Sequence, residues 1–227
     1  MTTKLLVISD THSNLYANPS ILDEAKKMGP FGALITLGDI SDKDYITLFR
    51  ELDDQIPTQV YGVLGNHDYI GALRTAHIQD LHMYAAQINE LTITGIQGAF
   101  DERAKGNEML RLTEEQGNEM IKQLPETNIL ATHGNWKQKK DSEERHVGLS
   151  GITEYLWSHK DCFLYVYGHL HESKTEYWVR KKCGQFQKLP RLFGYRKNVL
   201  TTVCIYKWAV IEIDLETKRV QVTHYHG

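Results

Sequence analysis

The sequence predicts an α/β fold, and three observations lead to that class. Near the N-terminus, short apolar runs alternate with segments of helical spacing, whereas strand-like runs dominate the C-terminal part. The chain has 227 residues, of which 41% are hydrophobic and 24% charged, as is ordinary for a globular protein. A fold of this size buries roughly three-quarters of its unfolded surface, so it needs no disulfide framework. We expect residues 1–227 to form a single domain.

The first five expected elements follow the order strand, helix, strand, helix, strand. The strands are apolar runs at residues 4–9, 33–37 and 59–64, which are typical of strands buried on both faces. The helices present apolar side chains on one side and span residues 19–28 and 42–52. This order predicts parallel strands joined by right-handed crossovers.

The rest of the chain is expected to be richer in strands. Residues 83–97 predict a hairpin, because residues 91–96 alternate as a half-buried strand does. Thr113 and Gln116 fit a capping box, which predicts a helix to about residue 124, and a second helix is expected at residues 150–159. The remaining strands are expected at residues 128–132, 163–167, 174–179, 199–205, 208–213 and 219–224.

Side chains that bind divalent metals directly follow five of these strands. They are Asp10 and His12, Asp39, Asn66 and His67, His133, and His169 and His171. Because the carboxyl ends of parallel strands lie at one edge of a sheet, these loops can converge on one point. Carboxylate, imidazole and amide ligands without thiolate suit borderline or hard divalent ions. Any one of these fragments is common by chance, but packing alone does not explain the whole ordered set.

The motifs also occur in the order of a known family. They are Asp10-Thr-His12, Gly38-Asp39, Gly65-Asn66-His67-Asp68, His133-Gly134 and Gly168-His169-Leu170-His171. This set resembles the calcineurin-like metallophosphoesterase superfamily, and the short gaps look most like its compact prokaryotic phosphodiesterase branch. The resemblance spans residues 5–171. It implies a two-sheet β-sandwich flanked by helices, layered α/β/β/α, with the site at the carboxyl ends of the strands.

The resemblance implies two divalent metal ions as cofactors. Asp10, His12 and His171 would hold one ion, Asn66, His133 and His169 the other, and Asp39 would bridge both. Manganese is the expected metal, with iron, zinc, nickel, cobalt and magnesium as alternatives. Two such ions carry more charge than the two aspartates cancel, which lowers the pKa of a bridging water to give hydroxide at neutral pH. His67 would stabilise the transition state or protonate the leaving oxygen.

The expected activity is hydrolysis of a small phosphate ester, with a nucleotide among the candidate substrates. We favour a phosphodiesterase, because no motif residue is a lysine or arginine that would favour a dianionic monoester. A phosphomonoesterase and a nucleotide pyrophosphohydrolase stay open as alternatives with the same centre. A non-catalytic binding module on this fold is a third, against which the complete ligand set argues.

Two further features bear on the substrate. Arg103 follows a strand-like segment and could hold a substrate phosphate with its guanidinium fork, or it could be solvated. The loop at residues 135–150 starts beside His133 and includes Trp136. A loop of that length anchored at the site often shapes substrate choice, although its charges could equally form a solvated face.

The charges are unevenly spread along the chain. The formal net charge is −3, yet residues 177–211 contain eight basic residues and no acidic one. Aromatic residues are interleaved with them, namely Trp178, Phe186, Phe193 and Tyr195. This composition occurs in nucleic-acid platforms, but also in strands with lysine outside and aromatics in the core. We favour a core or a subunit interface, so nucleic acid is not the expected partner and a homo-oligomer stays open.

The sequence predicts a cytoplasmic protein with no membrane partner. No apolar run approaches the length of a membrane span, and the first carboxylate comes too early for a signal peptide. Cys162, Cys183 and Cys204 form no CxxC pair, and we interpret them as small core residues.

Overall fold

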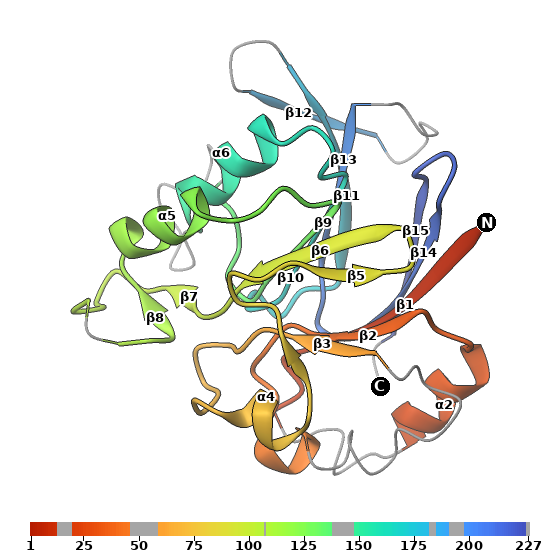
Figure 1. Cartoon of the computed structure of the whole chain (residues 1–227), viewed down its shortest axis with the longest axis horizontal. Helices are drawn as coiled ribbons and strands as arrows, with labels where there is room; N and C mark the ends of the chain where they lie inside the picture. Colours follow the sequence, from red (N-terminus) through yellow and green to blue (C-terminus); the bar gives the residue numbers. More distant parts are fainter. Residues whose placement is uncertain are drawn as a thin grey trace.

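A computed structural model gives the fold of this chain (Figure 1). It describes residues 1–12, 20–45, 59–106, 108–137, 148–181, 185–190 and 198–225, without the side chains of residues 20–22. Several predictions fall wholly or partly outside these residues. They concern residues 46–52 of the helix expected at 42–52, most of the loop at 135–150, residues 182–184 and 191–197 of the basic segment with Phe193 and Tyr195, and Cys183. The predicted α/β class is confirmed by two large sheets with few helices.

The first sheet has six strands in the order β15-β14-β1-β2-β3-β4. Its strands are β1 (Thr2–Ser9), β2 (Ala33–Thr36), β3 (Val60–Gly62), β4 (Gln79–Asp80), β14 (Lys207–Asp214) and β15 (Val220–Tyr225). The run from β1 to β4 is parallel, as the strand-helix-strand order predicts. β14 adds antiparallel to β1, and β15 adds antiparallel to β14.

The second sheet has seven strands in the order β12-β11-β13-β10-β9-β6-β5. Its strands are β5 (Ala86–Ile88), β6 (Leu91–Ile96), β9 (Ile129–Thr132), β10 (Leu164–Tyr167), β11 (Lys174–Arg180), β12 (Phe186–Leu189) and β13 (Val199–Cys204). β6, β9, β10 and β13 run parallel to one another. β11 and β12 add antiparallel at one edge, and β5 forms the predicted antiparallel hairpin with β6 at the other. A separate pair joins β7 (Ala99–Phe100) to β8 (Arg111–Leu112).

In the described part of the chain, the helices are α2 (Ser20–Met28), α4 (Ala72–Thr75), α5 (Glu114–Lys122) and α6 (Ser150–Ser158). Residues 42–45 are also helical, as the sequence predicts for the start of the helix at 42–52. The predicted capping box is present at α5: the Thr113 hydroxyl accepts from the Gln116 N–H, and the Gln116 side chain accepts from the Thr113 N–H. In Figure 1, α2 and α4 lie beside the first sheet, and α5 and α6 lie beside the second.

The four layers follow from the alternation of side chains along the strands. In β1, Leu5 and Val7 face a core between the sheets that also contains Ile129 of β9 and Val166 of β10. The neighbouring Leu6 and Ile8 face the opposite way, into a second core with residues of α2 and α4. A third core joins the outer face of the second sheet to α5 and α6. The predicted α/β/β/α architecture is therefore confirmed.

The sequence did not predict five short elements. These are α4, β4, β7, β8 and β12, each of two to four residues. Segments this short carry too few residues for a hydrophobic period to be visible. Among the described residues, no helix combines the length and apolar character needed to cross a membrane.

Candidate metal centre

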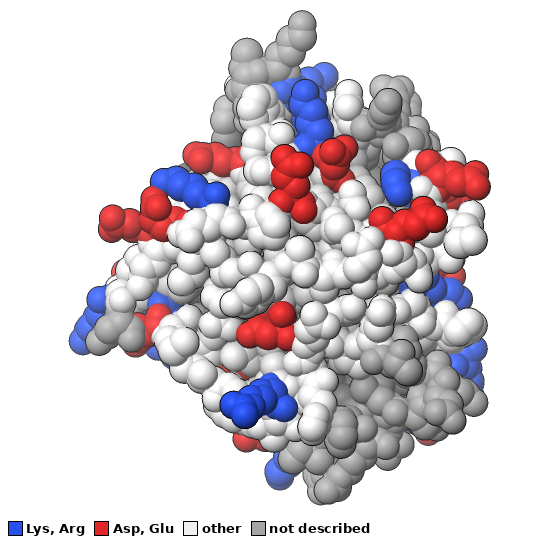
Figure 2. Space-filling view, in the orientation of Figure 1, with Lys and Arg blue, Asp and Glu red and all other residues white. Residues whose placement is uncertain are grey.

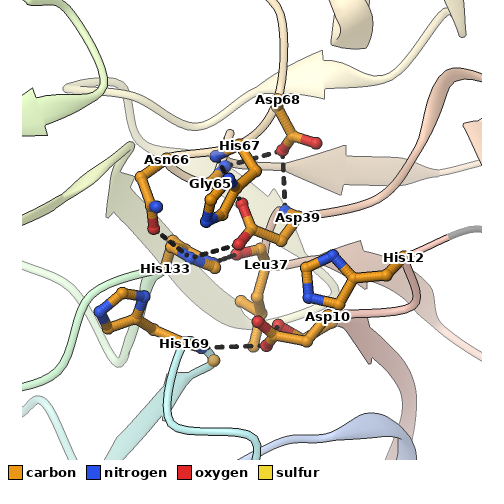
Figure 3. A network of polar contacts seen from close by, with 12 residues as sticks. Asp10, His12, Leu37, Asp39, Gly65, Asn66, His67, Asp68, His133 and His169 are labelled. Carbon is orange, nitrogen blue, oxygen red and sulfur yellow. Dashed lines mark hydrogen bonds and ion pairs between the residues drawn. The ribbon is translucent and has the colours of Figure 1, made fainter. Parts of the chain in front are cut away.

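The predicted ligands gather where the parallel strands of both sheets end. Asp10 follows β1, Asp39 follows β2, Asn66 follows β3, His133 follows β9 and His169 follows β10. Figure 3 shows their side chains drawn together from these separate loops. The convergence expected from the carboxyl-edge rule is thus present in the structure.

One group of potential ligands opens toward solvent. It consists of Asp10, His12 and His171, whose ligand atoms lie within 4.8 Å of one another, and we call it the open group. The Nε2 atoms of His12 and His171 are 3.2 Å apart, and the His171 Nε2 lies 3.4 Å from the Asp10 Oδ1. Imidazole nitrogens that converge beside a carboxylate provide the donor set that a divalent transition metal prefers.

A second group lies below the surface. It consists of Asp10, Asp39 and His133, again with ligand atoms within 4.8 Å, and we call it the buried group. The His133 Nε2 lies 3.4 Å from the Asp39 Oδ2 and 3.1 Å from the Asn66 Oδ1. Asp10 is the carboxylate common to both groups, so the two candidate positions adjoin each other.

His133 is held in one tautomer by the backbone. Its Nδ1 lies 2.8 Å from the Leu37 carbonyl oxygen, which can only accept, so Nδ1 carries the proton and donates. The lone pair of the neutral ring is then on Nε2, which faces Asp39 and Asn66. Metal-binding histidines are commonly oriented by such a bond from the second ring nitrogen.

Asp10 meets a structural test for a bound cation. Its Oδ2 accepts from the Ser9 hydroxyl at 2.6 Å and from the His169 N–H at 2.9 Å. Its Oδ1 is buried and has no hydrogen-bond partner among the residues that the structure describes. A buried carboxylate oxygen without a partner is costly in a protein, and a cation between the two groups would satisfy it. The residues therefore fit a metal centre.

Asp39 and His133 perturb each other electrostatically. Burial alone would raise the pKa of Asp39, but the hydrogen bond and charge of His133 and the His67 N–H at 2.8 Å lower it to about 2. Burial alone would likewise lower the pKa of His133, yet Asp39 raises it. Asp39 is consequently an anion throughout the neutral range, as a metal ligand must be.

Asp68 ties the loops after β2 and β3 together. Its carboxylate accepts from the backbone N–H of Gly65 at 2.7 Å, of Asp39 at 2.9 Å and of Ile40 at 2.9 Å. Burial raises its pKa to about 6, although the Gly65 N–H acts in the opposite direction. The Tyr45 hydroxyl also donates to Asp68, at 3.4 Å, so this carboxylate holds the two loops by backbone and side-chain bonds together.

The backbone of the centre is strained. Asp10, His12, Asp39, His169 and His171 all have positive φ, between 44° and 68°. Such angles cost energy for residues other than glycine and concentrate at functional sites. Two glycines permit the close approach of the loops: a Cβ on Gly65 would lie 2.1 Å from the Asp39 Oδ1, and one on Gly168 would lie 2.1 Å from the Ser9 Oγ.

His67 and His169 lie at the margins of the cluster. The exposed His67 ring has its centroid 6.3 Å from that of His12, and His67 belongs to neither group of potential ligands. The His169 ring packs edge-on against His133 with centroids 5.1 Å apart. This placement is compatible with His67 acting beside the metals and with His169 binding at the buried side.

Two polar supports of the cluster were not anticipated from the sequence. The fully buried Ser9 donates to Asp10, and the Thr11 hydroxyl donates to the Asp44 carboxylate at 2.6 Å, with both side chains buried. Ser9 is adjacent to a motif and could have been noticed there. The partner of Thr11 lies 33 residues away, and no local pattern connects the two.

Arg103 is not drawn into the cluster by any contact in the described residues. Its side chain is 83% exposed and pairs with Asp101, with the Nε 3.2 Å from the Oδ1. The sequence allowed Arg103 either to bind a substrate phosphate or to be solvated. Because Arg103 pairs with Asp101, phosphate binding stays a prediction.

Trp136 does not face the site. It is buried and packs edge-on against Trp178 and Phe186, with ring centroids 5.2 Å apart in each pair. The described cysteines, Cys162 and Cys204, are also buried, and burial raises the pKa of each thiol to about 12. They are core residues rather than nucleophiles, as expected.

Two basic residues of the segment are held by polar contacts within the fold. Arg180 donates to the carbonyls of Leu156 and Cys162 near the end of α6, and Lys188 pairs with the buried Glu176. On the face in Figure 2, basic side chains lie near acidic ones and form no continuous basic patch among the residues described. Trp178 and Phe186 lie against Trp136, which fits the core interpretation.

Comparisons with known proteins agree with this geometry. The family model for the calcineurin-like phosphoesterase superfamily domain matches residues 3–184. The chain therefore belongs to the calcineurin-like phosphoesterase superfamily, a class of metal-dependent phosphoester hydrolases. A search of curated protein sequences gives no match.

Solved structures show the same fold at low sequence identity. Phosphopantetheinyl hydrolase from Mycobacterium tuberculosis has a TM-score of 0.55 and 16% identity, with 90% of each chain covered. The calcineurin-like phosphoesterase YfkN from Bacillus subtilis has a TM-score of 0.54 and 10% identity, with 98% of this chain and 90% of that chain covered. A purple acid phosphatase from yellow lupin seeds has a TM-score of 0.52 and 9% identity, with 93% of this chain and 49% of that chain covered.

Proposed function

We propose that this protein is a phosphodiesterase that uses two divalent metal ions. The observation that carries the proposal is the pair of adjoining ligand groups that share the partly orphaned carboxylate of Asp10. The open group and the buried group would each hold one ion, with Asn66 and His169 completing the buried side. Asp39 would contact both ions, as the family resemblance implies, and its carboxylate lies within 4.8 Å of the Asp10 carboxylate that the two groups share.

The protein's own residues would position and complete the reaction. When bound, two divalent ions supply an activated water and neutralise charge on the phosphate. His133 and Asp39 fix the buried side, since both are buried and held by the Leu37 carbonyl and the His67 N–H. The exposed His67 ring would give a proton to the leaving oxygen as its bond to phosphorus breaks. Hydrolysis would convert the diester and one water into a phosphomonoester and an alcohol, with the proton from His67 on the alcohol oxygen.

The preference for diesters rests on charge. A diester carries one negative charge and a monoester up to two, so a monoesterase gains from fixed cations around the phosphate. No residue of the motifs is a Lys or Arg, and Arg103 is paired with Asp101. Manganese is the metal proposed for this oxygen- and nitrogen-rich set. A small ester, with nucleotides among the candidates, is the proposed substrate; a cytoplasmic location and a single domain over residues 1–227 stay predictions.

The test measures metal content and two activities on the same preparation. With Mn²⁺ present, kcat/KM for bis(p-nitrophenyl) phosphate should exceed that for p-nitrophenyl phosphate. A tenfold or greater preference for the monoester would contradict the diesterase and leave the metal centre standing. Two bound metals with hydrolysis of neither ester would favour a pyrophosphohydrolase, tested with a dinucleoside polyphosphate. No bound metal and no activity would favour a binding module.

A further inference from the structure

The same edge of the molecule carries a pocket outside the ligand groups. It is open, measures about 510 Å³ and has the size of a small-molecule site. Its walls come from the loop after β3, from α4 and β4, from the residue after β6, and from the segment before β8; they include Leu64, Ile70, Arg74, Asp80, Gln97 and Met109. None of these residues is among the potential metal ligands.

Chain connectivity keeps the pocket close to the metal centre. Consecutive Cα atoms are about 3.8 Å apart, so the Cα of Leu64 lies within about 8 Å of that of Asn66, and Ile70 within about 11 Å of His67. The Leu64 carbonyl accepts from the Gly98 N–H at 2.7 Å, and the Gly98 carbonyl accepts from the Gly134 N–H at 3.2 Å. These two hydrogen bonds connect Leu64 in the pocket wall, through Gly98, to Gly134, the residue after His133.

The rim of the pocket exposes large apolar side chains. Ile70 is 59% exposed and Met109 is 57% exposed, and Tyr69 next to Ile70 is 43% exposed. Large apolar side chains that stay exposed around a concave, partly polar surface are a common sign of a binding site. The unbranched thioether of methionine also adapts well to the face of an aromatic ring.

The polar groups of the pocket provide both hydrogen-bond donors and acceptors. Arg74 is exposed and forms no ion pair within the described part of the chain. The Asp80 Oδ1 accepts from the His82 N–H at 2.8 Å. The His82 Nδ1 accepts from the Gln97 N–H at 3.3 Å, which puts the ring proton on Nε2 as a further donor.

We propose that this pocket binds the nucleobase of a nucleotide ester whose phosphate lies at the metal centre. A base presents a flat apolar face and a polar edge, which match the Ile70 and Met109 rim and the Arg74, Asp80 and His82 groups. A purely aliphatic substituent would form no hydrogen bonds with these polar groups. The inference rests on the proposed function, because the metal centre is taken to hold the phosphate.

Three diesters with one leaving group test the proposal. They are the p-nitrophenyl esters of thymidine 5′-phosphate, phenyl phosphate and methyl phosphate, which share the p-nitrophenolate leaving group and a single negative charge. With Mn²⁺ present, kcat/KM for the thymidine ester should exceed that for the methyl ester by at least about tenfold, with the phenyl ester between them. Equal values for the thymidine and methyl esters would overturn the proposal. A phenyl ester equal to the thymidine ester would overturn the assignment to a base.

Variants locate the preference in the pocket. Ile70→Ser, Met109→Ser and Arg74→Ala should each reduce the thymidine-to-methyl ratio several-fold, mainly through the KM of the thymidine ester. Tyr84→Ser is the matched control, because Tyr84 is 71% exposed but does not line the pocket. An unchanged ratio in all three pocket variants would refute the placement.

A binding measurement separates the pocket from the hydrolytic activity. Thymidine is titrated into the metal-free protein labelled with ¹³C at the methionine methyl groups, with the Met109 signal assigned through Met109→Leu. Met109 should shift, whereas Met83, which does not line the pocket, should not. Hydrolysis of all three esters without a Met109 shift would overturn the pocket alone. A Met109 shift without hydrolysis of any ester would overturn the proposed function alone.

Discussion

The buried group and the open group share Asp10 but hold their histidines differently. His133 of the buried group is fully buried, with Nδ1 on the Leu37 carbonyl and Nε2 facing Asp39 and Asn66. His171 of the open group has a side chain 51% exposed, and its ring stacks on Tyr206 with centroids 5.2 Å apart. A ligand that is already fixed loses less conformational entropy when it binds. The buried side is therefore the better preorganised metal position.

The buried side is also more closely connected to the rest of the fold by hydrogen bonds. Asp39 connects it to the loops after β2 and β3, through the His67 N–H on its carboxylate and through its own N–H on Asp68. The open side depends on two loops that end in exposed imidazoles. Changes at the buried side should thus affect metal content, rate and stability together, whereas changes at the open side should affect metal content and rate only.

The largest effect is expected for Asp39→Asn. The proposed bridging ligand loses its charge, so both ions should bind more weakly, and the rate should fall further than for loss of any one histidine ligand. Metal analysis and kcat with bis(p-nitrophenyl) phosphate measure both quantities. A variant with two bound metals and near-normal turnover would contradict the bridging assignment. Asp101→Asn, which changes a carboxylate outside the ligand groups, is the matched control.

His67→Ala should come next in size. If His67 protonates the leaving group, the variant should keep both metals and lose roughly 10²–10⁴-fold in kcat. The loss should shrink for esters whose leaving group has a low pKa, because such groups leave without a proton. Comparing p-nitrophenyl and alkyl leaving groups on the same variant measures this. Loss of metal would instead make His67 a ligand or a structural residue.

A direct comparison of the two groups uses His133→Ala and His171→Ala. In the metal-free protein, His133→Ala removes the contact with the Asp39 Oδ2 and the donor to the Leu37 carbonyl, and it should lower the free energy of unfolding by about 1–3 kcal/mol. His171→Ala should leave Tm unchanged. In a chelator titration, this variant should show a lower affinity only for the more weakly bound metal. Equal Tm values for the two variants would remove the distinction between the groups.

The sequence could predict that the candidate ligands lie together, because each motif is a short continuous segment. Each ligand directly follows an apolar run, and the carboxyl-edge rule is enough to bring Asp10, Asp39 and His133 together. The polar residues that hold the loops of the centre could not be predicted in this way. Asp68 binds backbone groups 28 and 29 residues away, and Thr11 binds Asp44 across 33 residues, so both depend on how separate loops come to lie side by side.

The pocket beside the centre was invisible for a related reason. Its walls include α4 and β4, which span only four and two residues and show no hydrophobic period. Its rim contains Ile70 and Met109, two large apolar residues that the structure leaves exposed. Packing between distant segments decides such exposure, and hydrophobicity alone does not reveal it.

The smallest effect is expected for Arg103→Ala, which tests whether a cation outside both groups reaches the substrate. Arg103 is 83% exposed and paired with Asp101, so water and salt screen any contact with a phosphate. We expect KM for bis(p-nitrophenyl) phosphate to rise by less than about tenfold, with kcat and Tm unchanged. Arg111→Ala, at an exposed arginine of β8, controls for the general loss of positive charge. A fall in kcat at constant KM would mean that Arg103 acts on the transition state, and equal kinetics for the two variants would make Arg103 a solvated residue.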